Sequence, residues 1–293
     1  MMKKINDIIG DAKTIGIAGH VRPDGDCMGS CMSLYNYLKK NRPDLDVRVF
    51  LEFVDKKFNI IENTDQIITT GYDGTKFDLF ISLDTASLDR LGLNLPFYEN
   101  AKRTACIDHH ASNDGYADYN YILPKASSAS EVLYDLLDED LIDKSIAEPM
   151  YMGIAHDSGV FRFQSTTPKT MRIAANMIEK GVNVNMILEE TFFRKTYNQM
   201  MVTAKIQSEA VLALDGKCIY GYCTSEMMEE YGVTTKDLDA VVASIRNVDG
   251  VEVAMFLYQL SENSYKVSLR SKNYVDVSKI AVENGGGGHV RAA

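Results

Sequence analysis

The sequence predicts an α/β protein of two domains: an N-terminal domain with a parallel sheet covered by helices on both faces, and a smaller C-terminal α/β domain. Three features of the sequence support this fold class. The chain has 293 residues, which is long for a single hydrophobic core. Buried-strand patterns alternate with helical patterns through its first two thirds, as βαβ units require. A helical segment at 186–213 then precedes a second group of strands, so we expect domains at 1–185 and 214–293.

The N-terminal domain begins with an apolar run, TIGIAG at 14–19, which is typical of a strand buried on both faces. The segment CMGSCMSLYNYLKK at 27–40 has the pattern of the helix that follows. Similar patterns predict further strands at 46–51, 77–83 and 103–107, and helices at 128–140, 145–157 and 167–180. The last helix has the clearest ends, because Thr167 can cap it, Pro168 fits its first turn and Gly181 follows it.

The C-terminal domain is predicted from a second set of patterns, with strands at 217–223, 251–260 and 264–271 and helices at 234–247 and 276–284. Because both kinds of element are present, we expect this domain to be α/β as well. The chain ends in GGGGHVRAA, with no capping element after it. We therefore expect that this sequence is cut short of the natural C-terminus.

Composition excludes several classes of function. The formal net charge is −10, whereas a protein that binds a long nucleic acid needs clustered Lys and Arg. A short phosphorylated ligand is compatible with this charge if a bound metal supplies the positive charge.

No apolar run approaches the roughly 20 residues of a membrane helix, and the N-terminus lacks the apolar stretch of a secretory signal. We therefore expect no membrane partner and a cytoplasmic protein. The five cysteines form no CxxC pair, which favours free, buried thiols.

Histidine and aspartate residues gather where predicted strands and helices end. Four segments share this feature, and they contain His20, Asp24 and Asp26; Asp84; Asp108, His109 and His110; and His156 and Asp157. Each segment alone has an ordinary explanation, since Asp is common in turns and at helix N-termini. Together they hold four of the five histidines, and α/β proteins bind ligands at the carboxyl ends of parallel strands. The sequence therefore predicts one site assembled from all four segments.

The residue types in this site favour divalent metal ions. Carboxylates and imidazoles without thiols suit Mn²⁺, with Mg²⁺, Co²⁺ and Fe²⁺ as alternatives. Six ligands from these four segments would be too many for one catalytic ion with an open position. They suit two ions that share a carboxylate. Two ions about 3.5–4 Å apart stabilise a phosphoryl displacement and lower the pKa of a bridging water, so no side-chain nucleophile is needed. The adjacent His109 and His110 then fit a division of roles, one bound to metal and the other facing the substrate phosphate.

The same segments resemble a known family. GHVRPDGDCMGS, SLDTAS, IDHHASN and GIAHDSGVFRF are similar to the four motifs of the DHH phosphoesterase superfamily. SLRS and GGGGHVRAA resemble its C-terminal DHHA1 substrate-binding domain, so the resemblance extends over nearly the whole chain. Within the superfamily, the chain most resembles the bacterial bifunctional oligoribonucleases and pAp phosphatases, and cyclic di-nucleotide phosphodiesterases are near relatives.

The resemblance implies a role for each site residue. One Mn²⁺ would be held by His20, Asp24 and Asp84, and the other by Asp26, Asp84, His109 and Asp157, with Asp84 bridging the two ions. His110 would contact the scissile phosphate and help to protonate the leaving oxygen, while Asp108 would orient a histidine. His156 stands where relatives often carry a small residue, so we assign it no metal and expect a hydrogen-bonded histidine at a helix end.

In the second domain, the expected substrate-binding residues are Arg270, Gly286, Gly287, Gly288 and His289. Consecutive glycines expose backbone amides to a phosphate, and a nearby histidine adds a donor. An arginine can contact a terminal phosphate through two hydrogen bonds. A short substrate would thus be held at one end and cleaved at the other.

The activity that we expect is hydrolysis of short oligoribonucleotides to 5′-mononucleotides, together with removal of the 3′-phosphate of pAp. The alternative is a cyclic di-AMP or pApA phosphodiesterase, which would use the same metals. A manganese pyrophosphatase is disfavoured by the GGGGH signature, and a non-catalytic nucleotide sensor by the presence of all six ligands. The partners would be short oligonucleotides and pAp-type nucleotides as substrates, and a second copy of the chain, since family relatives are often dimers.

Overall fold

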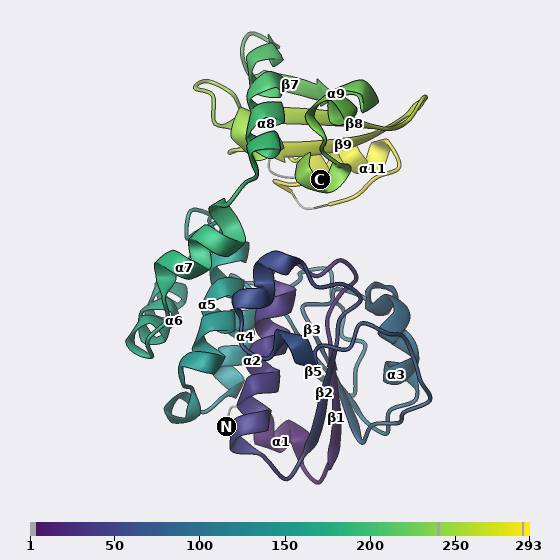
Figure 1. Ribbon diagram of the computed structural model, residues 1–293, viewed down its shortest axis with the longest axis vertical. Coiled ribbons are helices and arrows are strands. Elements are labelled where there is room, and N and C mark those ends of the chain that lie inside the picture. The colour runs from purple at the N-terminus through teal and green to yellow at the C-terminus, as the bar shows by residue number, and fades with distance from the viewer. Residues whose placement is uncertain (1–3, 239–240, 289) are drawn as a thin grey trace. The chain divides into compact units, whose positions relative to one another are not determined.

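The computed structural model describes residues 4–238, 241–288 and 290–293 and divides the chain into two compact units, Met1–Arg194 and Lys195–Ala293. Each unit contains one sheet and its own hydrophobic core (Figure 1). Within the described residues, no helix is both long enough and apolar enough to cross a membrane. The predicted fold class, a parallel α/β sheet followed by a smaller α/β unit, is confirmed.

The sheet of the first unit has five parallel strands in the order β2-β1-β3-β4-β5. These strands are β1 (Thr14–Ala18), β2 (Asp46–Phe50), β3 (Leu79–Leu83), β4 (Thr104–Asp108) and β5 (Tyr119–Ile122). Every residue of β3 and β4 is buried, which explains why their sequences are largely apolar runs. The edge strand β5 is absent from the sequence prediction, because its partly exposed residues mix Tyr with Asn and form no apolar run.

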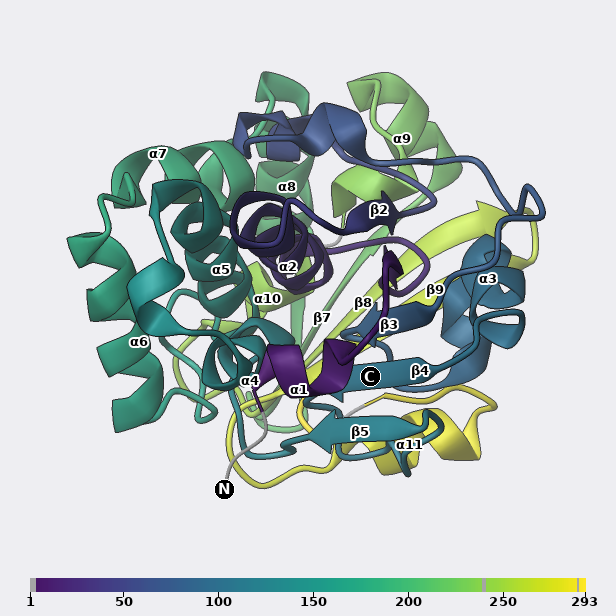
Figure 2. The ribbon, with the colours of Figure 1, turned by 90° about the horizontal axis from the view of Figure 1, so that it is seen from below.

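Helices cover both faces of this sheet (Figures 1 and 2). On one face, α2 (Gly25–Asn41), α4 (Ala129–Leu136) and α5 (Lys144–Asp157) pack together in the main core. On the other face, α3 (Leu95–Glu99) and the 3-10 helix η3 (Leu88–Asn94) enclose a smaller core rich in phenylalanine. The remaining elements of the unit are α1 (Ile5–Ile9), η1 (Lys56–Ile60), η2 (Thr64–Gln66), η4 (Glu139–Leu141), α6 (Pro168–Glu179), α7 (Val184–Leu188) and the π-helical turn η5 (Glu189–Phe193).

Helices α2 and α5 cross closely because glycines lie at their contact. A Cβ atom on Gly29 would lie 2.5 Å from the carbonyl oxygen of Pro149, and one on Gly153 would lie 2.1 Å from a side-chain oxygen of α4. Pro149 lacks the N–H that would bind the carbonyl of Ser145, and Asn36 of α2 donates to that carbonyl instead, at 2.8 Å. The crossing fixes the start of α2 relative to the end of α5, and both of these ends carry predicted site residues.

The sheet of the second unit has the order β6-β7-β8-β9, in which β7 and β8 are parallel and the outer pairs are antiparallel. Its elements are α8 (Tyr197–Glu209), β6 (Val211–Ala213), β7 (Cys218–Cys223), α9 (Ser225–Tyr231), η6 (Thr235–Leu238), α10 (Val241–Arg246), β8 (Val253–Ser261), β9 (Ser264–Ser271) and α11 (Val277–Glu283). Strand β6 corrects the helical prediction for the end of 186–213. It is a short, largely exposed edge strand, so no buried run marks it in the sequence. The rest of 186–213 is divided, with α7 and η5 in the first unit and α8 in the second.

Candidate metal centre

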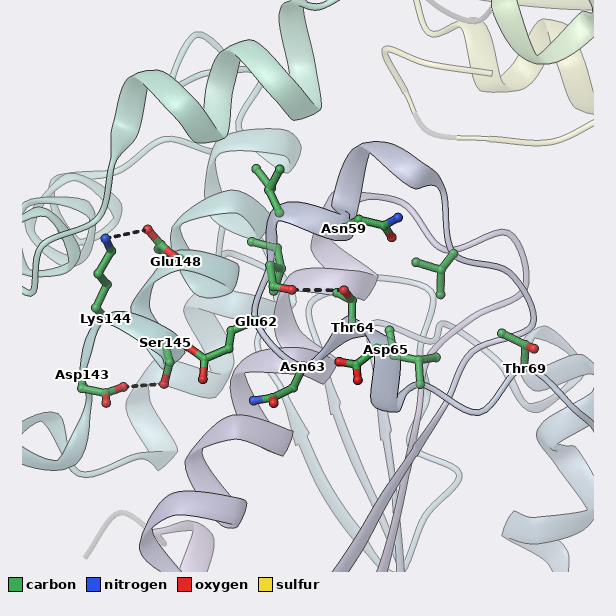
Figure 3. A pocket seen from close by; sticks show the side chains of 14 residues that line it. Asn59, Glu62, Asn63, Thr64, Asp65, Thr69, Asp143, Lys144, Ser145 and Glu148 are labelled. Carbon is green, nitrogen blue, oxygen red and sulfur yellow. Dashed lines mark hydrogen bonds and ion pairs between the residues drawn. The ribbon is translucent and has the colours of Figure 1, made fainter.

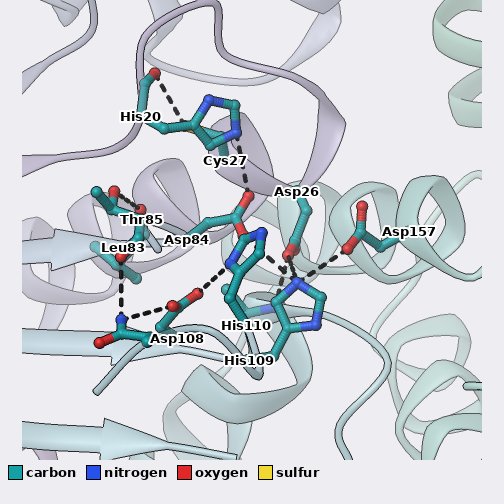
Figure 4. Close-up of polar contacts among 12 residues, drawn as sticks. His20, Asp26, Cys27, Leu83, Asp84, Thr85, Asp108, His109, His110 and Asp157 are labelled. Carbon is teal, nitrogen blue, oxygen red and sulfur yellow. Dashed lines mark hydrogen bonds and ion pairs between the residues drawn. The ribbon is translucent and has the colours of Figure 1, made fainter. Parts of the chain in front are cut away.

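The predicted site residues of the first unit come together at one edge of its sheet (Figure 4). They are His20 after β1, Asp24 and Asp26 at the start of α2, Asp84 after β3, Asp108, His109 and His110 at the end of β4, and Asp157 at the end of α5. Strands β1, β3 and β4 are neighbours, and the strand order reverses between β1 and β3. Such a switch point is where doubly wound sheets bind ligands.

His20 and Asp24 are oriented by the loop between β1 and α2. Nδ1 of His20 donates to the carbonyl oxygen of Val21 at 2.7 Å, so the lone pair of the ring is on Nε2, which faces the site. That nitrogen lies 3.7 Å from Oδ2 of Asp24 and 3.5 Å from Oδ2 of Asp84. Oδ1 of Asp24 caps α2 by accepting hydrogen bonds from two backbone amides of its first turn. The two oxygens of Asp24 therefore have different roles, one at the helix N-terminus and one toward His20.

Asp84 lies at the centre of the group and is only 3% exposed. Its φ of 50° is a left-handed conformation, which Asp tolerates better than most residues. Oδ2 faces Nε2 of His20 at 3.5 Å, whereas Oδ1 faces Nε2 of His109, also at 3.5 Å. Oδ1 of Asp84 and Nε2 of His109 are both buried, and neither atom has a hydrogen-bond partner in the described part of the chain. One carboxylate thus presents its two oxygens to two different histidines.

The second histidine, His109, faces two further carboxylates. Its Nε2 lies 3.1 Å from Oδ2 of Asp157 and 4.0 Å from Oδ2 of Asp26. Asp26 is fully buried and is held by the start of α4: Oδ2 accepts from the Ala129 amide at 2.6 Å, and Oδ1 accepts from the amide and hydroxyl of Ser130. The positive end of the helix dipole stabilises this carboxylate. Because a carboxylate oxygen can accept twice, Oδ2 of Asp26 keeps one lone pair, and this oxygen is the one near His109.

The pKa values of these groups show how strongly the site favours positive charge. Burial opposes protonation of His109, yet nearby carboxylates, above all Asp157 and Asp84, outweigh it and raise the pKa of His109 to about 12. The pKa of His20 is also raised to about 12, against the effect of burial, by the negative groups around it. Burial raises the pKa of Asp157 to about 6, and burial with the charges of Asp84 and Asp157 raises the pKa of Asp26 well above its usual range. Burial and neighbouring carboxylates contribute to the shifts of His109, Asp157 and Asp26, and bound cations would favour the ionised carboxylates.

The donor atoms fall into two groups that fit two divalent cations. The first group is His20, Asp24 and Asp84, the second is Asp26, His109 and Asp157, and within each the ligand atoms lie within 4.8 Å of one another. Two atoms that are each about 2.1 Å from one ion lie about 3 Å apart, so contacts of 3.1–3.5 Å need only a small adjustment. Oδ1 of Asp84 and Nε2 of His109 face each other at 3.5 Å and are buried without a hydrogen bond among the described residues, so both are placed to bind a cation. Carboxylates and imidazoles without thiols suit Mn²⁺ and similar ions.

His110 contacts this cluster through Nδ1, which lies 2.8 Å from Oδ1 of Asp108 and 3.7 Å from Oδ1 of Asp84. Burial would raise the pKa of Asp108, but His110 outweighs it and holds that pKa below its usual range, so Asp108 is an ionised acceptor. Nδ1 of His110 therefore carries a proton and cannot bind a metal. We therefore assign no ion to the third set of close donors, Asp84, His109 and His110. A contact between His110 and a substrate would be made through Nε2.

Sequence reasoning missed two residues that hold the site together. Asn113 is 8% exposed, and its Nδ2 donates to Oδ2 of Asp108 at 2.7 Å. Ser130 binds Asp26 across 104 positions of sequence. The available signals were weak, because Asn113 only ends the segment IDHHASN and Ser130 only belongs to a Ser-rich helix start. No local pattern shows which carboxylate a distant donor will bind.

His156 lies beside the site without joining it. Its Nε2 donates to Oγ1 of Thr191 at 2.9 Å, because the hydroxyl of Thr191 is already donated to the carbonyl of Ile187. The ring packs against Gly25, where a Cβ atom would lie 2.1 Å from it. Burial lowers the pKa of His156 to about 4. It is thus a neutral, hydrogen-bonded histidine at the end of α5, as the sequence predicts.

In the second unit, Arg270 and Gly288 lie near one edge of the sheet. Arg270 is in β9, and the last residues of the chain form an antiparallel bridge with this strand. Gly288 packs against those residues, since a Cβ atom on it would lie 2.4 Å from their backbone. Gly286 donates its amide to the end of α11, whereas a Cβ atom on Gly287 would meet no described atom within 4 Å. His289 lies outside the described residues.

A cavity of about 1010 Å³ lies elsewhere on the first unit (Figure 3). It is lined by η1, η2 and the start of α5, and its lining includes none of the residues of the metal centre and no histidine. Three of its charged groups have partners, since Lys144 pairs with Glu148 at 3.6 Å and Asp143 accepts from Ser145. The candidate site is therefore identified by its donor atoms and not by the size of a hollow.

The chain is similar to known proteins over nearly its whole length. The DHH family, N-terminal domain, matches residues 14–154, and the DHHA1 domain matches residues 215–293. The chain is 32% identical to the bifunctional oligoribonuclease and PAP phosphatase NrnA of Thermus thermophilus, over 95% of this chain and 82% of that protein. It is 27% identical to the protein of the same name from Bacillus subtilis, over 96% of this chain and 88% of that one. A solved exopolyphosphatase-related protein from Bacteroides fragilis has a TM-score of 0.89 and 23% identity, covering 98% of this chain and 88% of that chain.

These matches confirm that the chain resembles the DHH and DHHA1 domains. The first family match contains His20, Asp84 and the histidine pair, and the second contains Arg270 and the glycine-rich segment. The solved structure supports the fold alone, because its identity is low. The relatives, in contrast, extend over nearly the whole chain at an identity that shows common descent. On these grounds the chain belongs to the DHH family of metal-dependent phosphoesterases, with a DHHA1 domain as its second unit.

Proposed function

We propose that this protein uses two divalent cations, Mn²⁺ with Mg²⁺ or Co²⁺ as alternatives, to degrade short oligoribonucleotides to 5′-mononucleotides and to remove the 3′-phosphate of pAp. The observation that supports this most is Asp84, whose two buried oxygens face two separate groups of His and Asp. A carboxylate placed in this way can bind two ions that lie about 3.5–4 Å apart, the spacing of paired ions in phosphoesterases. The relatives from T. thermophilus and B. subtilis carry both activities in their names.

In this proposal, His20, Asp24 and Asp84 hold one ion, and Asp26, Asp84, His109 and Asp157 hold the other. When bound, the ions supply an activated water and neutralise charge on the phosphate. His110 approaches the scissile phosphate through Nε2, because its Nδ1 donates to Asp108. It donates a proton to the leaving ribose oxygen, and Asp108 holds the ring in the tautomer that this transfer needs.

The proposed substrates are short because nothing in the charge of the chain suits a long nucleic acid. The formal net charge of −10 would repel an extended phosphate backbone. The second unit contributes Arg270, Gly286, Gly287, Gly288 and His289 as the residues that bind a substrate phosphate other than the one that is cleaved. We further propose that the protein is a homodimer, which light scattering on the purified chain would measure.

The test is a substrate panel on purified protein with added Mn²⁺. It includes dinucleotide to pentanucleotide RNAs, a long RNA, pAp, pApA and cyclic di-AMP. We expect 5′-mononucleotides from the short RNAs, AMP from pAp, slow turnover of the long RNA, and loss of all activity in EDTA. Efficient hydrolysis of cyclic di-AMP without hydrolysis of pAp would replace this proposal by the cyclic di-nucleotide alternative.

Two aspartates at opposite ends of β3 supply a matched pair of variants. Asp84 follows the strand, and Asp84→Ala should abolish both activities together. Asp78 directly precedes β3 and accepts hydrogen bonds from the backbone amides of Lys13 and Thr14. Asp78→Asn should therefore reduce stability and leave turnover unchanged. Mn²⁺-dependent turnover by Asp84→Ala would remove the two-ion model.

A further inference from the structure

A buried chain of hydrogen bonds connects Asn113 to His110. Nδ2 of Asn113 donates to Oδ2 of Asp108 at 2.7 Å, and Oδ1 of Asp108 accepts from Nδ1 of His110 at 2.8 Å. Asp108 is 0% exposed, so water does not compete for either oxygen. Each oxygen of Asp108 is bound by one side-chain donor. The direction in which Asp108 presents its second oxygen to His110 is therefore set by the donor that binds the first.

Asn113 is itself held at several points. Nδ2 also donates to the carbonyl oxygen of Thr85 at 3.1 Å, and Oδ1 accepts from the amide of Gly115 at 2.9 Å. Its backbone amide donates to the carbonyl oxygen of His110 at 3.2 Å. Thr85 directly follows Asp84, so Asn113 joins the end of β3 to the end of β4 behind the metal centre. An amide side chain suits this place, because it has two donors on one atom and an acceptor on the other.

We infer that Asn113 is a positioning residue for the hydrolytic reaction: it orients Asp108, and through Asp108 it orients the ring of His110 toward the leaving oxygen. This inference rests on the proposed function, in which His110 protonates that oxygen. Asn113 touches neither substrate nor metal in this role. Without its amide, Asp108 would lose the donor on Oδ2 and could rotate, so the ring of His110 would lose its fixed direction.

The chemistry of the leaving group distinguishes this role from a purely structural one. In hydrolysis of a phosphodiester, the water oxygen bonds to phosphorus, the bond from phosphorus to the ribose oxygen breaks, and that oxygen takes a proton from His110. The proton that His110 gives up is restored from the water that attacked. A ribose oxygen is strongly basic and needs this proton, whereas p-nitrophenolate leaves as a stable anion. Misorienting His110 should therefore slow cleavage of RNA far more than cleavage of bis-p-nitrophenyl phosphate.

The experiment is a double-mutant cycle with both substrates in Mn²⁺, using the wild type, Asn113→Ala, His110→Ala and the double variant. Asn113→Ala should lower kcat for a short RNA by about 10- to 100-fold with little change in KM, the usual range for residues behind a metal site. The loss on bis-p-nitrophenyl phosphate should be several-fold smaller. In the His110→Ala background, Asn113→Ala should cause no further loss on RNA, because the two residues act as a unit.

Asn36 provides the matched control, since it is also a buried asparagine of the first unit and also donates to a backbone carbonyl, that of Ser145. Asn36→Ala should lower the melting temperature without changing the ratio of kcat for the two substrates. If Asn113→Ala does not fold, Asn113→Leu takes its place, because it keeps a similar shape and removes the donor without adding a charge. Equal losses on both substrates, or losses that multiply with those of His110→Ala, would overturn the inference. A wild type that does not cleave short RNA would refute the proposed function instead, so the two failures are distinct.

Discussion

Asp24 uses its two oxygens for two purposes, and a conservative substitution separates them. Oδ1 caps α2 by accepting from the amides of Asp26 and Cys27 at 3.0 and 3.1 Å, while Oδ2 lies 3.7 Å from Nε2 of His20. Asn caps helices about as well as Asp. It replaces the other oxygen by an amide nitrogen, which has no lone pair for a cation. Asp24→Asn should therefore keep the helix and lose the ligand, whereas Asp24→Ala should lose both.

The expected magnitudes follow from these contacts. Asp24→Asn should leave the free energy of unfolding of the metal-free protein within about 0.5 kcal/mol of the wild type. Asp24→Ala should cost about 1 kcal/mol, or about 2–4 °C in melting temperature for a unit of this size. Mn²⁺ at about 100 times its dissociation constant stabilises the wild type by about 2.7 kcal/mol for each site. Both variants should lose the part of this stabilisation that comes from the His20 group.

Thermal unfolding in EDTA and in Mn²⁺, combined with turnover of a short RNA, measures the cap and the ligand separately. The two variants should differ from each other in EDTA and behave alike in Mn²⁺, where both should have lost most turnover. A wild-type response of Asp24→Asn to Mn²⁺, with wild-type turnover, would refute the reasoning. Asp24 would then be a helix cap alone.

Three further predictions concern the centre and the frame around it. Asp84→Asn should weaken Mn²⁺ binding at both sites, so isothermal titration should show a larger loss than for any ligand of a single group. Gly153→Ala would place a Cβ atom 2.1 Å from Oγ of Ser130. The variant should lose about 1–3 kcal/mol of stability in urea unfolding and should bind Mn²⁺ more weakly. Unchanged Mn²⁺ binding would show that the crossing of α2 and α5 does not set the site. Asp78 has its pKa held well below the usual range by Lys102 and by backbone amides. Because its folded-state pKa lies below the unfolded value, the stability that it contributes should be complete above about pH 4 and decline as the pH falls further, and Asp78→Asn should remove this dependence in urea unfolding at graded pH.

The part of the site that could be predicted from the sequence is the part that strand ends determine. A residue directly after a buried parallel strand must lie at the ligand-binding edge, so His20, Asp84 and His109 could be placed together without coordinates. The contacts that orient these ligands could not be predicted. Ser130 reaches Asp26 across 104 positions of sequence, and such a contact depends on how α2, α4 and α5 pack.

The same reasoning explains which strands were missed. Pattern analysis finds strands that are buried, because burial requires a run of apolar residues. The edge strands β5 and β6 are partly exposed and carry no such run. The predicted core of each sheet was therefore correct, and the errors lie at the edges, where backbone pairing alone defines a strand.

The metal centre and the helix crossing beside it are best understood together. Two features of the centre are costly by themselves: Asp84 has a left-handed backbone, and burial with neighbouring carboxylates raises the pKa of Asp26. Such an arrangement of residues persists only if the surrounding structure holds it in place. The close contact of α2 and α5 at Gly29 and Gly153 does so, because the start of α2 carries Asp26 and the end of α5 carries Asp157 into the same group of ligands. A rigid frame would thus hold the proposed site ready for cations.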